Sequence, residues 1–342
     1  MDPAQFCAQA RLLIVAGKGG VGKTTVSAAM ALVAAREGLT SLVVELEGKS
    51  GLGSAFGRSE VLTYHETVLA AGGGPDGAAD VRARTLTPDD ALVEYLEGHG
   101  MGRMSRRLAA SGALDVVATA VPGIKDILVL GKVKQLERAS AAGEEGASDF
   151  LVLDGPAAGH AVTLLMSAQA LLDAVSVGPI RSQASDVSEL LRDPSRCQVM
   201  LVTLPEETPV NEVVETAFAL EDRVGLHLAP IVVNGLYPAV DLDTDVEAAA
   251  ERAGVRLTAA ERDALAGAAD FRRRRQAFQA EQVGRLADAL PLPQIHLPYV
   301  FTTDLGRPEV ELLATALAGE IGRLPEPVGA PVAGPVTGPA RP

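Results

Sequence analysis

The sequence predicts a doubly wound α/β fold with a mainly parallel sheet, and three observations lead to this prediction. Short runs rich in Val, Leu and Ile recur along the chain, and several are continuously apolar, which is typical of strands buried on both faces. Helical patterns separate the runs, as a parallel sheet requires. A glycine-rich segment joins the first run to the first helix. The expected strands cover residues 12–16, 41–46, 150–154, 171–178, 199–204 and 231–234.

Two long helices can be placed from composition and end signals. Residues 25–37 are rich in Ala and other helix formers, and Gly38 is a residue type suited to ending a helix. Residues 258–290 carry a second long helical pattern, rich in Arg and Glu.

The interval between the second and third expected strands is much longer than a simple crossover. It spans residues 58–147, about ninety residues, where a dozen would suffice. Helical stretches occur at 89–97 and 127–138, and residues 72–77 form a Gly/Pro/Asp loop. We therefore expect a helical insert at about 58–147.

The chain is expected to form one domain over residues 1–324, followed by a disordered tail. Residues 325–342 contain six prolines and three glycines, a composition that cannot pack a core. The sequence contains a single phosphate loop and no internal repeat.

Composition restricts the partners and the compartment. The formal net charge of −14 disfavours nucleic acid as a partner, and the arginine run 272–275 points to all sides of a helix that also carries acidic residues. Cys7 and Cys197 match no zinc or disulfide spacing and are expected to be free thiols. Without a signal peptide or a spanning segment, we expect a cytoplasmic protein, with a peripheral position at the inner membrane left open.

The glycine-rich segment carries the motif G-x-x-x-x-G-K-[ST]. Its backbone N–H groups are suited to hold phosphate oxygens, its lysine to meet the β- and γ-phosphates of ATP, and its threonine to bind Mg²⁺. The following helix would point its positive end at the same anion. The expected binding residues are Gly19, Gly20, Val21, Gly22, Lys23, Thr24 and Thr25.

A second lysine, Lys18, follows the first glycine of the motif. The loop thereby resembles the deviant Walker A class of P-loop NTPases, whose motif is K-G-G-x-G-K-[ST]. In that class the additional lysine reaches the nucleotide of a partner subunit. The resemblance therefore implies a catalytic role in trans for Lys18.

Asp154 ends the strand expected at 150–154 and begins the sequence D-G-P-A-A-G-H. A carboxylate at this strand end can hold the magnesium shell through water, and the small residues after it allow movement when phosphate leaves. The segment resembles the second switch, D-T-A-P-T-G-H, of the arsenite-pump and tail-anchored-protein-targeting ATPases. His160 is as compatible with a structural hydrogen bond as with catalysis.

The segment 47–57 resembles the first switch of the same family, D-P-A-H-x-L-x-D-A-F. Leu52, Ala55 and Phe56 set the register, which places Glu47 where the family has the Asp that polarises the attacking water. The longer side chain, and the replacement of D-P-A-H by E-G-K-S, imply slow or partner-dependent hydrolysis, because small misplacements are costly. Glu45 is the reserve candidate for this role.

Two later segments resemble the family's adenine site. Asn234 ends a strand, and its amide could both donate and accept hydrogen bonds to a base, although Asn-Gly after a strand is also an ordinary turn. The sequence L-P-Y that contains Pro298 resembles the segment that closes over the base.

Together these resemblances, which extend over about residues 11–300, imply a Mg²⁺-dependent ATPase in a single-length form. They imply a homodimer, or a heterodimer with a related ATPase chain, that couples ATP binding and hydrolysis to binding of an unknown protein client or to membrane-related targeting or transport. The zinc-binding Cys-x-x-Cys pair of the eukaryotic targeting ATPase is absent from the sequence, as is the metalloid-binding cysteine cluster of the arsenite pump.

Three alternatives stay open at the level of sequence. A partition or division-site ATPase would need a basic face or an amphipathic C-terminal helix. A small-metabolite kinase would be a monomer with no use for Lys18. A nucleotide-binding scaffold that barely hydrolyses ATP, completed by a paired subunit, is compatible with Glu47.

Overall fold

The computed structural model confirms the doubly wound α/β class. It describes residues 1–49, 51–73, 77–98, 123–239 and 246–326. Eight strands of this part of the chain form one sheet in the order β3-β4-β2-β5-β1-β6-β7-β8. Neighbours are parallel except for the antiparallel edge pair β3–β4. The strands are β1 Leu12–Gly17, β2 Ser41–Leu46, β3 Thr67–Ala70, β4 Val81–Leu86, β5 Phe150–Ala157, β6 Cys197–Thr203, β7 Ile231–Leu236 and β8 Gln294–Pro298.

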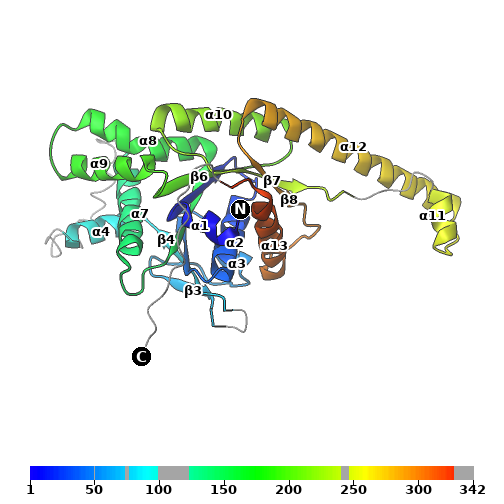
Figure 1. The fold of residues 1–342 in the computed structure, drawn as a ribbon, viewed down its shortest axis with the longest axis horizontal. Coiled ribbons are helices and arrows are strands. Elements are labelled where there is room, and N and C mark those ends of the chain that lie inside the picture. Colours follow the sequence, from blue (N-terminus) through cyan, green and yellow to red (C-terminus); the bar gives the residue numbers. More distant parts are fainter. Residues whose placement is uncertain (50, 74–76, 99–122, 240–245, 327–342) are drawn as a thin grey trace.

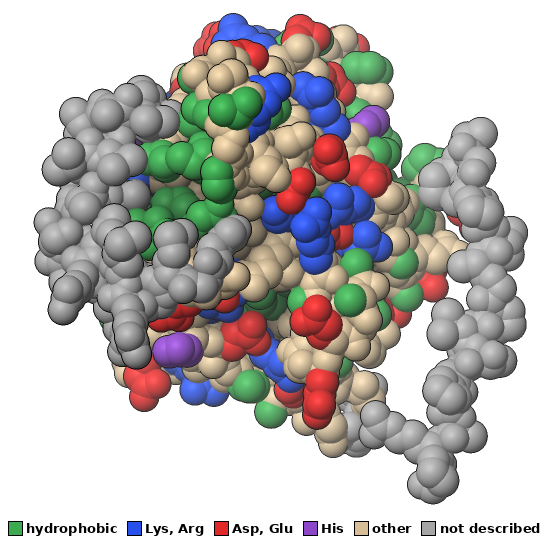
Figure 2. Space-filling model, turned by 90° about the vertical axis from the view of Figure 1, so that its left-hand side faces the viewer, with side chains coloured by type: hydrophobic (Ala, Val, Ile, Leu, Met, Phe, Trp, Pro, Cys, Tyr) green, Lys and Arg blue, Asp and Glu red, His purple; other side chains and the backbone are tan. Residues whose placement is uncertain are grey.

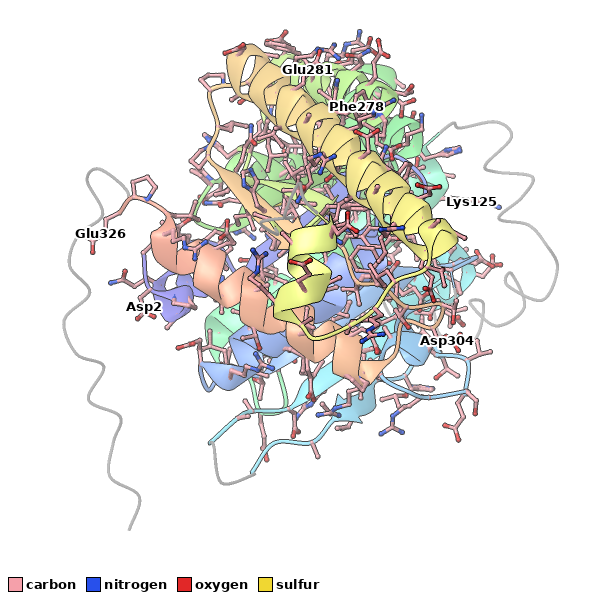
Figure 3. All side chains as sticks on the ribbon, turned by 90° about the vertical axis from the view of Figure 1, so that its right-hand side faces the viewer. Asp2, Lys125, Phe278, Glu281, Asp304 and Glu326 are labelled. Atoms are coloured by element: carbon pink, nitrogen blue, oxygen red, sulfur yellow. The ribbon has the colours of Figure 1, made fainter. Side chains whose placement is uncertain are left out.

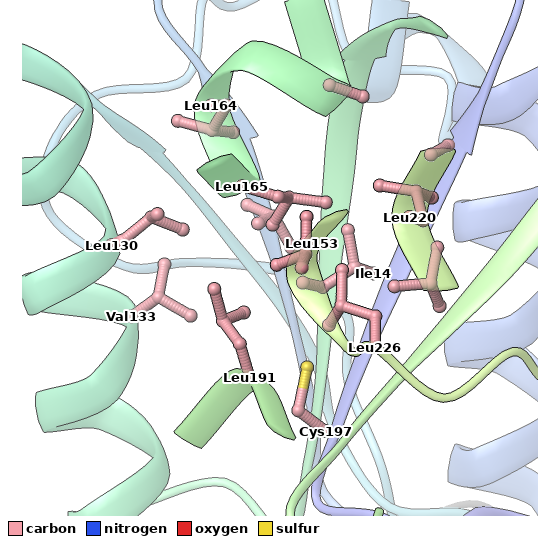
Figure 4. Close-up of a cluster of buried hydrophobic side chains, with 14 of the residues drawn as sticks. Ile14, Leu130, Val133, Leu153, Leu164, Leu165, Leu191, Cys197, Leu220 and Leu226 are labelled. Carbon is pink, nitrogen blue, oxygen red and sulfur yellow. The ribbon is translucent and has the colours of Figure 1, made fainter. Parts of the chain in front are cut away.

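Helices cover both faces of the sheet (Figure 1). One face packs against α1 Pro3–Ala8, α2 Lys23–Arg36, α3 Gly51–Ala55 and α13 Arg307–Arg323. The other face packs against α7 Ile124–Ala142, α8 Ala158–Ala174, α9 Pro179–Arg192 and α10 Glu207–Val224. Figure 4 shows the core on this second face, where Ile14 and Leu153 from neighbouring strands meet leucines of α7, α8, α9 and α10.

The central strands are buried along their length, as continuously apolar runs predict. All six residues of β1 are buried, and β1 lies between β5 and β6. The parallel register sets Val15 beside Asp154 and Gly17 beside Val202. The carboxyl ends of three strands therefore meet at one edge, which is where ligands bind in open α/β sheets.

The interval 58–147 differs from the predicted helical insert. β3 and β4 lie within it and extend the main sheet beyond β2, and its described helices are α4 Pro88–Gly98 and α7. In β4, Arg82 and Thr85 are only partly buried, and β3 has only four residues, so neither strand presents a long apolar run. Residues 99–122 lie outside the described residues. Figure 2 shows the side of the molecule on which α4, α7 and α9 lie in Figure 1, and charged and hydrophobic side chains lie close together on it.

The prediction of a strand at 171–178 is wrong. Leu171 lies in α8, and the chain leaves the helix at Val175. Leu164, Leu165, Ala168 and Leu171 form the buried stripe of this helix, so the apolar residues at 171–175 continue a helical period. Short apolar runs do not distinguish a strand from a buried helix segment.

An arm leaves the body of the molecule (Figures 1 and 3). It consists of α11 Val246–Arg252 and the 31-residue α12 Ala259–Ala289. Thr258 and Glu261 cap the start of α12 with reciprocal hydrogen bonds. Only Gln279, Gln282 and Leu286, all near its C-terminal end, are buried. Most of the tail predicted at 325–342 lies outside the described residues. Among the helices that are described, none has the length and apolarity needed to cross a bilayer.

A buried carboxylate ties α7 to the sheet. The Glu137 side chain is fully buried and accepts hydrogen bonds from Arg11 Nε at 2.9 Å and from Arg196 Nη2 at 2.5 Å. These arginines precede β1 and β6. Burial opposes ionisation of Glu137, but the hydrogen bonds and charges of Arg196 and Arg11 outweigh it and hold the pKa of Glu137 below its usual value.

We expect Glu137→Gln to lower the free energy of unfolding at pH 7 by about 3 kcal/mol, because two arginines lose their buried partner. Since the folded pKa is depressed, the wild-type advantage should be full above pH 4.5, the unfolded value, and should vanish as the pH falls through the lower folded pKa. Urea denaturation at pH 7 and pH 3 measures the difference in free energy of unfolding between wild type and variant and its decrease at low pH. Glu144→Gln, at an exposed site after α7, is the control, and an equal loss in the two variants would refute the role of Glu137.

Candidate nucleotide site

The phosphate loop connects β1 to α2, and two of its glycines are required by close contacts. Gly17 has φ of 154°, and a Cβ placed there would lie 2.2 Å from the carbonyl oxygen of Val202. Gly22 has φ of 93°, and a Cβ there would lie 2.3 Å from Nδ2 of Asn234. No other residue type fits either position without moving backbone or a neighbouring side chain.

Lys23 is folded onto its own loop. Its ammonium donates to the carbonyl oxygens of Gly17 at 3.0 Å and Lys18 at 2.8 Å. Burial, with a further contribution from the charge of Lys49, lowers the pKa of Lys23, and Asp154 opposes the shift. The loop tip, Gly19 and Gly20, is exposed, while Val21 is buried and Thr25 is half-buried in the first turn of α2. An anion entering the loop would therefore meet its backbone N–H groups and the ammonium of Lys23.

Asp154 is the centre of the polar cluster at this edge. Its carboxylate is buried, and Oδ2 accepts a hydrogen bond from Thr24 Oγ1 at 2.7 Å. Ser27 Oγ lies 3.5 Å from Oδ1. The same Oδ2 lies 2.8 Å from the ammonium nitrogen of Lys49. The structure thus brings together the two residues that the sequence predicted as magnesium ligands, Thr24 and Asp154.

These oxygens fit Mg²⁺ chemically. A hydroxyl and a carboxylate are hard oxygen donors of the kind this ion takes, directly or through retained water. The carboxylate already attracts a cation, since Lys49 contacts it. Within the described residues no cluster of three or more His, Cys, Asp or Glu offers a metal site of another kind.

The two candidate carboxylates of the first switch occupy different environments. The side chain of Glu47 is exposed and lies outside the cluster around Asp154. Glu45 is 1% exposed, pairs with Asp154 in the β2–β5 register, and has an Oε1 with no hydrogen-bond partner among the described residues. Burial, with Asp154 adding to it, raises the pKa of Glu45, against the opposing effects of Lys49 and the Gly51 N–H.

Lys18 points away from its own phosphate site. Its ammonium lies 2.5 Å from Oε1 of Glu212 on α10, and about a third of its side chain is exposed. The predicted second lysine is therefore held at the entrance of the loop by a surface carboxylate of the same chain.

Asn234 lies in the carboxyl half of β7, beside the loop, and Pro298 ends the neighbouring strand β8. Asn234 Nδ2 donates to the carbonyl oxygen of Val21 at 2.9 Å, so this side chain braces the phosphate loop. Pro298 pairs with Leu236, and the Tyr299 N–H donates to the Leu236 carbonyl at 2.7 Å. The predicted base-binding residues thus lie on neighbouring strands, and one amide donor of Asn234 is already used.

Sequence reasoning did not assign a function to Ser27, Lys49 or Glu212. Ser27 is three residues after Thr24 and faces the same way on α2, so the helical period could have identified it. Lys49 was noted only as a departure from the family pattern. Its contacts with Asp154, like that of Glu212 with Lys18, join positions more than 100 residues apart, and no local pattern indicates them.

Comparisons with known proteins identify relatives of this chain. The family model described as Anion-transporting ATPase matches residues 10–176. The Mycobacterium tuberculosis protein named ATPase BagA is 31% identical over 312 residues, which cover 86% of this chain and 89% of that protein.

Two longer relatives are similar over part of their length. The arsenical pump-driving ATPase of Escherichia coli is 27% identical over 70% of this chain and 41% of its own length. A putative arsenical pump-driving ATPase of Halobacterium salinarum is 28% identical over 67% of this chain and 36% of its own length. With its phosphate loop, its Thr24–Asp154 pair and a relative matched over nearly its whole length, the chain belongs to the anion-transporting ATPase family.

Proposed function

We propose that this ATPase is a magnesium-dependent switch in which two chains close on ATP and open after hydrolysis. The observation that carries the proposal is the juxtaposition of Lys23 and Thr24, in the first turn of α2, with Asp154 of β5, where Thr24 Oγ1 lies 2.7 Å from Asp154 Oδ2. Lys23 would hold the β- and γ-phosphates, and Thr24 and Asp154 would hold Mg²⁺, directly and through water respectively. The ion, when bound, would neutralise charge on the phosphate oxygens.

The dimeric form of the switch rests on Lys18. Its ammonium lies on Glu212 rather than over its own loop, and the side chain is partly exposed. An exposed ion pair is worth little, about 0–1 kcal/mol, so Lys18 can exchange Glu212 for the phosphates of a partner chain at small cost. The partner would be a second copy or a related ATPase chain.

Glu47 is our candidate for polarising the attacking water. It lies in a loop and is exposed, so movement of that loop could bring it to the γ-phosphate. Glu45 is 1% exposed beneath the site, where a water molecule in line with the phosphate would have little access to it.

Movement at the site would reach a client through α8. This helix begins four residues after Asp154 and packs against α7, α9 and α10. Release of the γ-phosphate would therefore shift the helical layer on that face of the sheet. We infer that the layer binds or releases a protein client, membrane-associated by analogy with the relatives named as pump-driving.

We expect specific ATPase activity to rise with protein concentration and to fall about a thousandfold in Lys18→Ala, because a charge supplied in trans stabilises the transition state. Phosphate release across a concentration series measures this, with sedimentation to follow dimer formation. Lys132→Ala, on α7 and paired with Glu94, is the control for loss of a lysine. Activity that is independent of concentration and retained in Lys18→Ala would refute the trans-acting dimer.

We expect Glu47→Gln to lower the single-turnover rate at least a hundredfold with unchanged ADP affinity, because an amide polarises water poorly. Glu45→Gln should keep most of this rate. The reverse pattern would assign the role to Glu45. Negligible wild-type turnover at every concentration, with ADP binding intact, would favour the weakly hydrolysing scaffold that a paired subunit completes.

A further inference from the structure

Lys49 binds the second switch through three oxygen atoms. Its ammonium lies 2.8 Å from Asp154 Oδ2 and donates to the carbonyl oxygens of Asp154 at 3.0 Å and Gly155 at 2.6 Å. The side chain is 22% exposed, while the Asp154 side chain is fully buried. Carboxylate and carbonyl oxygens arranged around one cation resemble the environment of a bound metal ion.

We propose that Lys49 is a tethered cation that takes the place of Mg²⁺ beside Asp154 when nucleotide is absent, and that Mg²⁺ with nucleotide displaces it. The inference rests on the proposed function, because it concerns the same magnesium site. Lys49 acts here as a positioning residue, since it works through Asp154.

The local backbone directs Lys49 to this position. The N–H of Lys49 donates to the Leu46 carbonyl at 3.2 Å, which closes a tight turn directly after β2. Gly48 lies at the third position of that turn with φ of 85°, a conformation that favours glycine. The turn returns the chain toward β5, so that the Lys49 side chain reaches Asp154.

Electrostatics makes the two cations alternatives. A buried carboxylate needs a counter-charge, and Lys49 supplies one while Thr24 donates to the same oxygen. Mg²⁺ held by Thr24 and Asp154 would bring two positive charges to within a few ångströms of the ammonium, and this repulsion is strong in a partly buried site. Binding of the ion therefore requires Lys49 to leave.

The displacement would also release one switch from the other. Lys49 belongs to the first switch segment, and its acceptors Asp154 and Gly155 begin the second. While Lys49 stays on Asp154, it joins the two segments. Once it leaves, Glu47, two residues earlier on the same turn, is free to move with the loop.

The first test is the coupling between Mg²⁺ and ADP, measured as the ratio of ADP dissociation constants in EDTA and in saturating Mg²⁺. We expect calorimetry to give a ratio about tenfold larger in Lys49→Met than in wild type, because the ion no longer has to displace a cation. Lys132→Met, which removes another largely buried, paired lysine, should keep the wild-type ratio. Lys49→Arg, which retains the charge, should lie between wild type and Lys49→Met.

An unchanged ratio in Lys49→Met would overturn this inference alone. Absence of ADP binding by wild type would overturn the proposed function, and the inference with it.

The second test uses wild type only, so it does not depend on folding of a variant. Acylation of lysine amines, read by mass spectrometry, should increase severalfold at Lys49 when Mg²⁺ is added to the ADP-bound protein, because the ammonium leaves its three acceptors. Labelling of Lys132 should stay constant. Equal or lower labelling of Lys49 with Mg²⁺ would contradict displacement.

Discussion

The arrangement of this site depends on the interactions of the buried Asp154 carboxylate. It lies within β5, three residues before that strand ends, and is buried between β1 and β2, where an unpaired charge would be costly. Thr24 from the first turn of α2 and Lys49 from the turn after β2 both bind it. One charged group therefore joins three segments that are distant in sequence: β5, the start of α2 and the turn after β2. A change in the cation that contacts Asp154 should alter the position of all three segments.

The fold and the centre of the site could be predicted because local sequence determines them. Strands buried on both faces are continuously apolar, and the phosphate loop requires glycines at set positions. Asp154 was predicted from its place at the end of an apolar run, although β5 continues to Ala157. β3 and β4 were missed because β3 is short and polar residues interrupt the sequence of β4. Residues 171–178 were predicted as a strand because an apolar helix stripe looks the same over a few residues.

The rest of the site could not be predicted because it depends on where side chains meet across the fold. The family register places Glu47 at the catalytic position, but the turn at Gly48 leaves Glu47 exposed and brings Lys49 inward. Lys18 is identified by its motif, whereas its contact with Glu212 depends on how α10 packs over β1 and β6. The departure of residues 47–50 from the family pattern thus marked this turn as unusual, and the structure identifies Asp154 as the partner of Lys49.

The arm formed by α11 and α12 would enlarge small rotations of the body of the molecule. α12 is anchored to the body from Arg272 onward: Arg272 and Gln276 donate to the Pro238 carbonyl after β7, and Arg275 pairs with Glu206, directly before α10, the helix that also carries Glu212. The 13 residues from Ala259 to Phe271 span about 20 Å of helix, so a tilt of about 10° at the anchor displaces the far end by about 3 Å. A rotation beside the phosphate loop that is too small to open a groove would therefore produce a larger displacement at the far end of the arm. A molecule bound to that end would be moved by it.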